Sequence, residues 1–141
     1  MHPLHPMLVH FPIALLTTSV AFEALAMRWP SERLRASSLD MLVVGVLAAV
    51  AAVVSGHLAE EAVENRGIPE QVLEWHEGLG FATFWIFAGV LAMRVAMAWG
   101  LLRDRPIWPL LLGLVGIAVL LVAGYFGGEL VYRFGAGVSP P

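Results

Sequence analysis

The sequence contains no cysteine and no lysine, and only 13% of its 141 residues are charged. Without cysteine the chain cannot form a disulfide, a thiolate metal site, an iron–sulfur cluster or a covalent c-type haem attachment. The eight basic residues are all arginine and are scattered along the chain, so no basic patch indicates nucleic acid. Histidine and carboxylate side chains therefore remain as the strong ligands for a metal or a haem.

Apolar residues dominate: 59% of the chain is hydrophobic and the mean hydropathy is +0.79. A membrane-spanning helix needs about 20 apolar residues, and four stretches qualify. Capping and proline signals extend them to helices at about 7–27, 39–66, 69–99 and 107–132. The pattern predicts an all-α integral membrane four-helix bundle that forms a single domain, 1–141, and contacts lipid. No nucleophile triad or phosphate loop is present, which favours a non-enzymatic protein.

The first segment begins with polar residues and prolines, His5-Pro6-Met7-Leu8-Val9-His10-Phe11-Pro12. Pro6 suits a first helical position, whereas Pro12 should bend the helix by freeing the carbonyl of Leu8. An unpaired imidazole in hydrocarbon is costly, so each histidine inside this helix needs a partner, a metal or a cofactor.

Arginine counts predict the orientation in a bacterial inner membrane. Six arginines fall in or near the 1–2 and 3–4 loops, and two fall on the opposite side. The positive-inside rule then places both termini and the 2–3 loop in the periplasm. All the histidines lie on or near that side: His2, His5, His10, His57 and His76.

An internal repeat is suggested by residues 10–28 and 76–94, which match at an offset of 66 with six identities in nineteen positions. If the repeat is real, two helical hairpins are related by a pseudo-twofold axis along the membrane normal. His10 and His76 would then face each other. Chance similarity between apolar helices is the alternative interpretation.

Two facing imidazoles in a helix bundle are typical of b-type haem ligation. The haem interpretation makes His10 and His76 the axial ligands, with His57 as a substitute ligand or a propionate contact and His5 at the nearby helix cap. Glycines would give space to the macrocycle. These glycines are Gly78, Gly80, Gly124, Gly127 and Gly128. The alternative is that the histidines make only local hydrogen bonds.

A transition-metal ion is a further possibility. His57 and Glu61 have the i, i+4 spacing of a helical ligand pair. His76 or Glu74 from another helix, or His10, would complete the site. Such a pair at a helix end is also common on a solvated surface.

Glu23 and Arg94 are the charged residues that lie most clearly inside apolar helices. A Glu23–Arg94 ion pair between two helices would reduce the cost of both charges. Snorkelling of Arg94 to the headgroups is the rival explanation.

The opening His5-Pro6-x-x-Val9-His10-Phe11-Pro12-Ile13-Ala14-Leu15, Glu23 and the ending Gly127-Gly128-Glu129-Leu130-Val131-Tyr132-x-x-Gly135 carry a resemblance. The chain resembles a widespread family of uncharacterised bacterial four-helix membrane proteins, a domain of unknown function. Some relatives are joined to Rieske or cytochrome c-like domains, so the resemblance implies electron transfer.

The leading hypothesis is a small haem-binding electron-transfer protein with its site near the periplasmic face. Its partner would be a periplasmic redox protein or a larger membrane complex. The alternatives are a cofactor-free accessory subunit, which could dock or form a homo-oligomer through the glycines of the last helix, and a periplasmic-facing His/Glu metal-binding protein.

Overall fold

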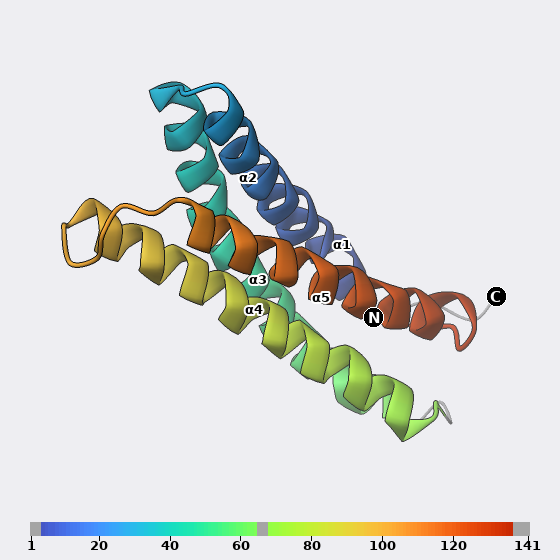
Figure 1. Ribbon diagram of the computed structural model, residues 1–141. Helices are drawn as coiled ribbons and strands as arrows, with labels where there is room; N and C mark the ends of the chain where they lie inside the picture. The colour runs from blue at the N-terminus through green and yellow to red at the C-terminus, as the bar shows by residue number, and fades with distance from the viewer. Residues whose placement is uncertain (1–3, 65–67, 137–141) are drawn as a thin grey trace.

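The computed structural model describes the backbone of residues 4–64 and 68–136, and the side chains of residues 4–59 and 68–136. These residues form α-helices and no strand, which confirms the all-α class. The helices are α1 (Leu4–Leu8), α2 (His10–Arg28), α3 (Glu32–Glu64), α4 (Glu70–Ala98) and α5 (Ile107–Tyr132). Figure 1 shows α1 continuing into α2, so the five helices make four long rods.

All four rods are long and apolar enough to cross a membrane. The candidate spans are Leu4–Arg28, Glu32–Ala59, Glu70–Ala98 and Ile107–Tyr132. Large apolar side chains cover their outer faces; Leu47, Trp85 and Leu121, for example, are 64–68% exposed. Such surfaces suit lipid rather than water.

The first rod is interrupted at Val9, between α1 and α2. Pro12 has no N–H to donate to the carbonyl of Leu8, one helical turn earlier. Helical bonding continues on both sides, because Val9 N donates to His5 O (3.1 Å) and Ile13 N donates to Val9 O (3.3 Å). The break in the helix that Pro12 was expected to cause therefore lies at Val9, one residue after Leu8.

The second rod starts earlier than residue 39, the start predicted from the sequence. Ser31 caps α3, because Leu34 N donates to Ser31 Oγ (3.4 Å), and Glu32 lies in the first turn, where the helix dipole favours an acid. The connection between α2 and α3 therefore contains only residues 29–31. The predicted end at residue 66 lies outside the described residues.

Two antiparallel hairpins, α2–α3 and α4–α5, make up the bundle. They join through contacts of α3 with α4 and of α2 with α5, so that α2 and α4 lie on one diagonal of the bundle. Buried side chains of α2, α3 and α4 form the core between the hairpins. Its buried members are Leu16, Val20, Leu42, Val46, Phe87 and Val90.

The two hairpins repeat the same contacts at an offset of 71. A Cβ added to Gly45 would lie 2.7 Å from Leu16 Cδ2, and one added to Gly116 would lie 2.8 Å from Phe87 Cε2. Leu16 precedes Phe87 by 71 positions, and Gly45 precedes Gly116 by 71 positions. The pseudo-twofold arrangement of hairpins is therefore present, but the predicted offset of 66 is wrong.

Candidate functional site

Two histidines face each other across the bundle at the end that holds the start of α1. The ring centroids of His5 (α1) and His76 (α4) are 5.9 Å apart, and the ring planes make an angle of 80°. The two residues are counterparts at the offset of 71. His76 lies six residues after the start of α4, which places it about 9 Å inside the end of that helix. We call these two residues the histidine pair.

Each ring of the histidine pair is fixed by a bond to the backbone of the other helix in its hairpin. Nδ1 of His5 lies 2.9 Å from the carbonyl oxygen of Ala52, and Nδ1 of His76 lies 3.0 Å from that of Ala123. A carbonyl oxygen only accepts, so Nδ1 carries the proton in both rings. In the neutral imidazoles the lone pair then belongs to Nε2, the nitrogen that commonly binds a metal when Nδ1–H is held by a carbonyl.

Glycines lie beside both rings. A Cβ at Gly56 would come within 3.0 Å of His5 Cε1, and a Cβ at Gly127 would come within 2.8 Å of His76 Cε1. The missing side chains let the imidazoles approach the backbones of α3 and α5. Gly127 was singled out from the sequence as a source of space for a haem, whereas Gly56 was not.

An apolar cavity of about 250 Å³ lies against the histidine pair. Residues from all the helices line it, and many of those on α3 and α5 are small. The small residues include Ala49, Ala52, Gly56, Ala123, Gly124 and Gly127. Of the other predicted glycines, Gly80 lines the cavity, whereas Gly78 and Gly128 do not.

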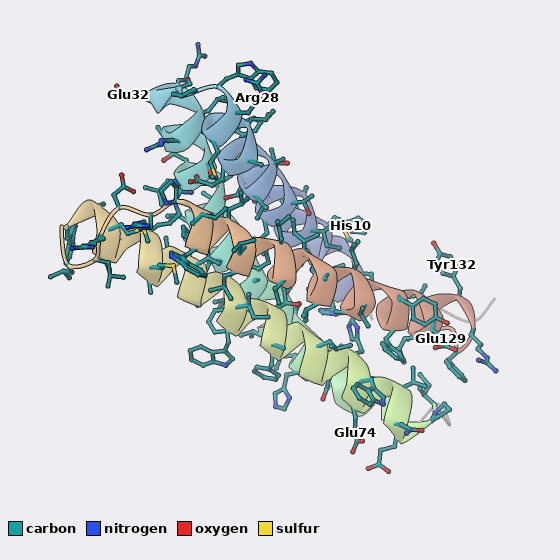
Figure 2. All side chains as sticks on the ribbon, in the orientation of Figure 1. His10, Arg28, Glu32, Glu74, Glu129 and Tyr132 are labelled. Atoms are coloured by element: carbon teal, nitrogen blue, oxygen red, sulfur yellow. The ribbon has the colours of Figure 1, made fainter. Side chains whose placement is uncertain are left out.

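The structure corrects the role expected of His10. His10 is exposed and does not line the cavity, and Figure 2 shows it on the side of the first rod away from α4. Residues five apart in a helix differ by about 140° around the axis, so His5 and His10 cannot both face the centre. His5 takes that place, and the expectation that His10 faces His76 is wrong.

The structure brings together only part of the metal-ligand set predicted from the sequence: His57 and His76 line the cavity, whereas His10 does not. His57 is exposed on α3 and lines the cavity, whereas the side chain of Glu61 lies outside the described residues. Glu74, another candidate near His76, points away from the bundle in Figure 2. Among the described residues, no three histidine or acidic side chains come together in a way that could hold a metal ion.

Glu23 and Arg94 form an ion pair at the opposite end of the bundle. Arg94 Nη2 lies 3.2 Å from Glu23 Oε2, and Arg94 Nη1 donates to Ser38 Oγ (2.7 Å). Ser38 is fully buried and also contacts Glu23 Oε2 (3.3 Å). The structure therefore confirms the Glu23–Arg94 ion pair that the sequence suggested, rather than snorkelling of Arg94 to the headgroups.

The glycines proposed as a docking surface on the last helix lie inside the bundle. Gly113 packs against Val20, and Gly116 packs against Phe87 and Ile86. Both glycines are buried, so they serve contacts between the helices of this chain. The prediction that these two glycines form a docking face for a second protein is therefore wrong.

A family model described as "Predicted membrane protein (DUF2231)" matches residues 1–140. No curated protein and no solved structure matches the chain.

Proposed function

The chain belongs to this family of membrane proteins, and we propose that it binds a b-type haem between its hairpins and transfers electrons. His5 and His76 would hold the haem iron, so His5 would take the role that the sequence suggested for His10. The site lies near the end that contains both the start of α1 and the end of α5 (Figure 1).

The observation that carries this proposal is the presence of two facing imidazoles without a third ligand in the described chain. A bare transition-metal ion in a protein takes three or four ligands from side chains. A haem brings four nitrogens of its own, so its iron needs only two axial ligands from the protein. A site with two imidazoles therefore favours haem over a free metal ion.

The spacing of the histidine pair supports the same conclusion. Two imidazoles bound to one metal through bonds of about 2 Å each have ring centres about 6 Å apart. The observed separation of the centroids is 5.9 Å. The bonds from Nδ1 to Ala52 and Ala123 leave Nε2 of each ring with the lone pair that an iron would accept.

The small residues that line part of the cavity support the binding of a flat cofactor. The alanine and glycine residues of α3 and α5 that line the cavity would give space to the macrocycle. The cavity volume of about 250 Å³ is below the roughly 300 Å³ at which ligand pockets begin, so binding requires the hairpins to separate slightly. His57 lies at the cavity as a contact for a propionate.

Bound haem would supply reversible one-electron oxidation and reduction. The chain's own residues hold the two axial positions, exclude water with apolar walls and keep the site close to one membrane surface. The arginine distribution supports a position of that surface in the periplasm of a bacterial inner membrane. A periplasmic redox protein or a larger membrane complex is the partner that such a position suits.

Absorption spectroscopy of the full-length protein tests the proposal. The purified protein, supplied with haem, should give the sharp spectrum of six-coordinate low-spin iron. His5→Ala and His76→Ala should each lose that spectrum, while His10→Ala, on the outer face, should retain it. A wild-type protein that takes up no haem, or a His10→Ala protein that alone loses the spectrum, would overturn the proposal. Elemental analysis of the same samples shows whether a bare metal binds instead.

A further inference from the structure

We infer that Gly56 and Gly127 are positioning residues of one repeated device, which gives His5 and His76 the same tautomer and leaves the lone pair of each ring on Nε2. The device is an Ala-x-x-x-Gly sequence, Ala52 to Gly56 on α3 and Ala123 to Gly127 on α5, which we call the Ala-Gly motif. The inference stands on the contacts of the two rings and does not require the ligand to be a haem.

The two copies of the Ala-Gly motif act in the same register. Each histidine bonds to an alanine carbonyl 47 positions later in the chain. Each ring also lies against the glycine one helical turn beyond that alanine. Three residues of one hairpin thus correspond to three of the other at an offset of 71 (5 to 76, 52 to 123, 56 to 127).

Glycine is needed because the imidazole occupies the place of a side chain. A Cβ at Gly127 would lie 2.8 Å from His76 Cε1, closer than real Cβ atoms approach other groups, and 3.2 Å from Nδ1. The nearest atoms belong to a ring held by its own hydrogen bond, so that ring would have to leave the carbonyl. The adjacent Gly128 has nothing within 4 Å of a Cβ, which makes it a matched control.

The first copy has one addition. Ser55 Oγ lies 3.1 Å from Nδ1 of His5 and donates to the carbonyl of Ala52, whereas the equivalent position in the second copy is Phe126. His5 therefore has two acceptors for its Nδ1–H and His76 has one. We expect Gly127→Ala to change the tautomer of His76 more completely than Gly56→Ala changes that of His5.

The shared tautomer restricts the class of ligand. Two Nε2 lone pairs can bind a Lewis acid or accept hydrogen bonds from a donor, and they repel an anion or a carbonyl oxygen. The site is therefore built for an electron-pair acceptor bound by both hairpins, a class that includes the iron of the proposed haem.

Nitrogen NMR of the full-length protein in micelles tests the inference without any cofactor. In histidine-labelled wild-type protein above the imidazole titration range, both members of the histidine pair should show protonated Nδ1 and unprotonated Nε2. His5→Ala and His76→Ala assign the signals. Gly127→Ala should alter the His76 pattern alone, Gly56→Ala the His5 pattern alone, and Gly128→Ala neither.

The inference fails if either wild-type ring carries its proton on Nε2, or if Gly127→Ala leaves the His76 tautomer unchanged. The wild-type measurement decides the first point even where a variant does not fold. If both rings show the expected tautomer but the protein never binds haem, the proposed function fails and the inference stands. If haem does bind, Gly127→Ala should weaken its affinity about tenfold to a hundredfold, and Gly128→Ala should not.

Discussion

Arg94 and Glu23 carry opposite charges inside membrane-spanning helices, and each depends on the other and on Ser38. Arg94 donates to Ser38 Oγ and also to the carbonyl of Arg35 (3.1 Å). Ser38 and Ser19 are bonded in turn, because Ser19 Oγ donates to the carbonyl of Ser38 (2.7 Å). The cluster joins α2, α3 and α4, so it connects the two hairpins at the end opposite to the histidine pair.

Glu23→Gln should destabilise the protein strongly. Glutamine keeps the shape and a hydrogen-bonding oxygen, but it leaves the largely buried guanidinium of Arg94 without a counter-charge. Loss of one partner from a buried pair costs about 3–5 kcal/mol. We expect a loss of about 3 kcal/mol in the free energy of unfolding, measured by denaturation in mixed micelles.

The exposed pair Glu129–Arg133 provides the matched control for this experiment. Its atoms are closer, at 2.7 Å, but the Arg133 side chain is 71% exposed. Exposed i, i+4 pairs contribute about 0.3–0.5 kcal/mol, so Glu129→Gln should cost less than 1 kcal/mol. Equal losses for the two variants would show that the buried pair has no special role.

The sequence allowed the Glu23–Arg94 pair to be predicted, because both charges stand alone in apolar segments. It did not reveal the part played by Ser38. Beside Asp40 this serine resembles a helix cap, and only the early start of α3 at Glu32 places it inside the helix and against Arg94. A cap and an interior serine cannot be distinguished until the helix start is known.

At the scale of helices, glycines on α3 and α5 allow the hairpins to close. Gly45 and Gly116 occupy equivalent positions and lie against Leu16 and Phe87, which are both fully buried. A small residue at a helix contact lets two backbones approach closely, which is how helices often pack in membranes.

Gly116→Ala should therefore destabilise the bundle, even though alanine is the better helix former. The new Cβ would lie 2.8 Å from the ring of Phe87 and 3.0 Å from Ile86 Cγ2, and overpacking of this kind costs about 1–3 kcal/mol. In Gly89→Ala the nearest atom would be 3.8 Å away, so that variant should be neutral or up to about 1 kcal/mol more stable. Unfolding in micelles compares the two, and a stabilised Gly116→Ala protein would contradict this account of the contact.

The register between the hairpins could not be found by matching letters. The offset of 66 gives six identities over residues 10–28, whereas the offset of 71 gives one, Ala21 with Ala92. Apolar helices draw on few residue types, so identities arise by chance. The contacts preserve position instead: Leu16 corresponds to Phe87, and Glu23 corresponds to a residue of opposite charge, Arg94.

For the whole molecule, hydropathy and length were sufficient to predict four spanning helices, because a bilayer imposes both on any chain that crosses it. A pair of facing histidines was predicted at the correct end of the bundle, but with His10 in the place that His5 occupies. Which of His5 and His10 faces inward depends on the rotation of the first rod, and the break at Val9 affects that rotation. Neither hydropathy nor spacing gives the rotation of a helix that is apolar on all sides.

The orientation of the whole bundle is open to a direct experiment, since the natural chain contains no cysteine. Glu70, at the start of α4, and Asp104, between α4 and α5, are both exposed and lie toward opposite ends of the bundle. In intact cells, a membrane-impermeant maleimide should label Glu70→Cys and should reach Asp104→Cys only after the membrane is broken, because arginine-rich loops stay in the cytoplasm. The reverse pattern would put the histidine pair at the cytoplasmic surface, where a periplasmic electron carrier could not approach it.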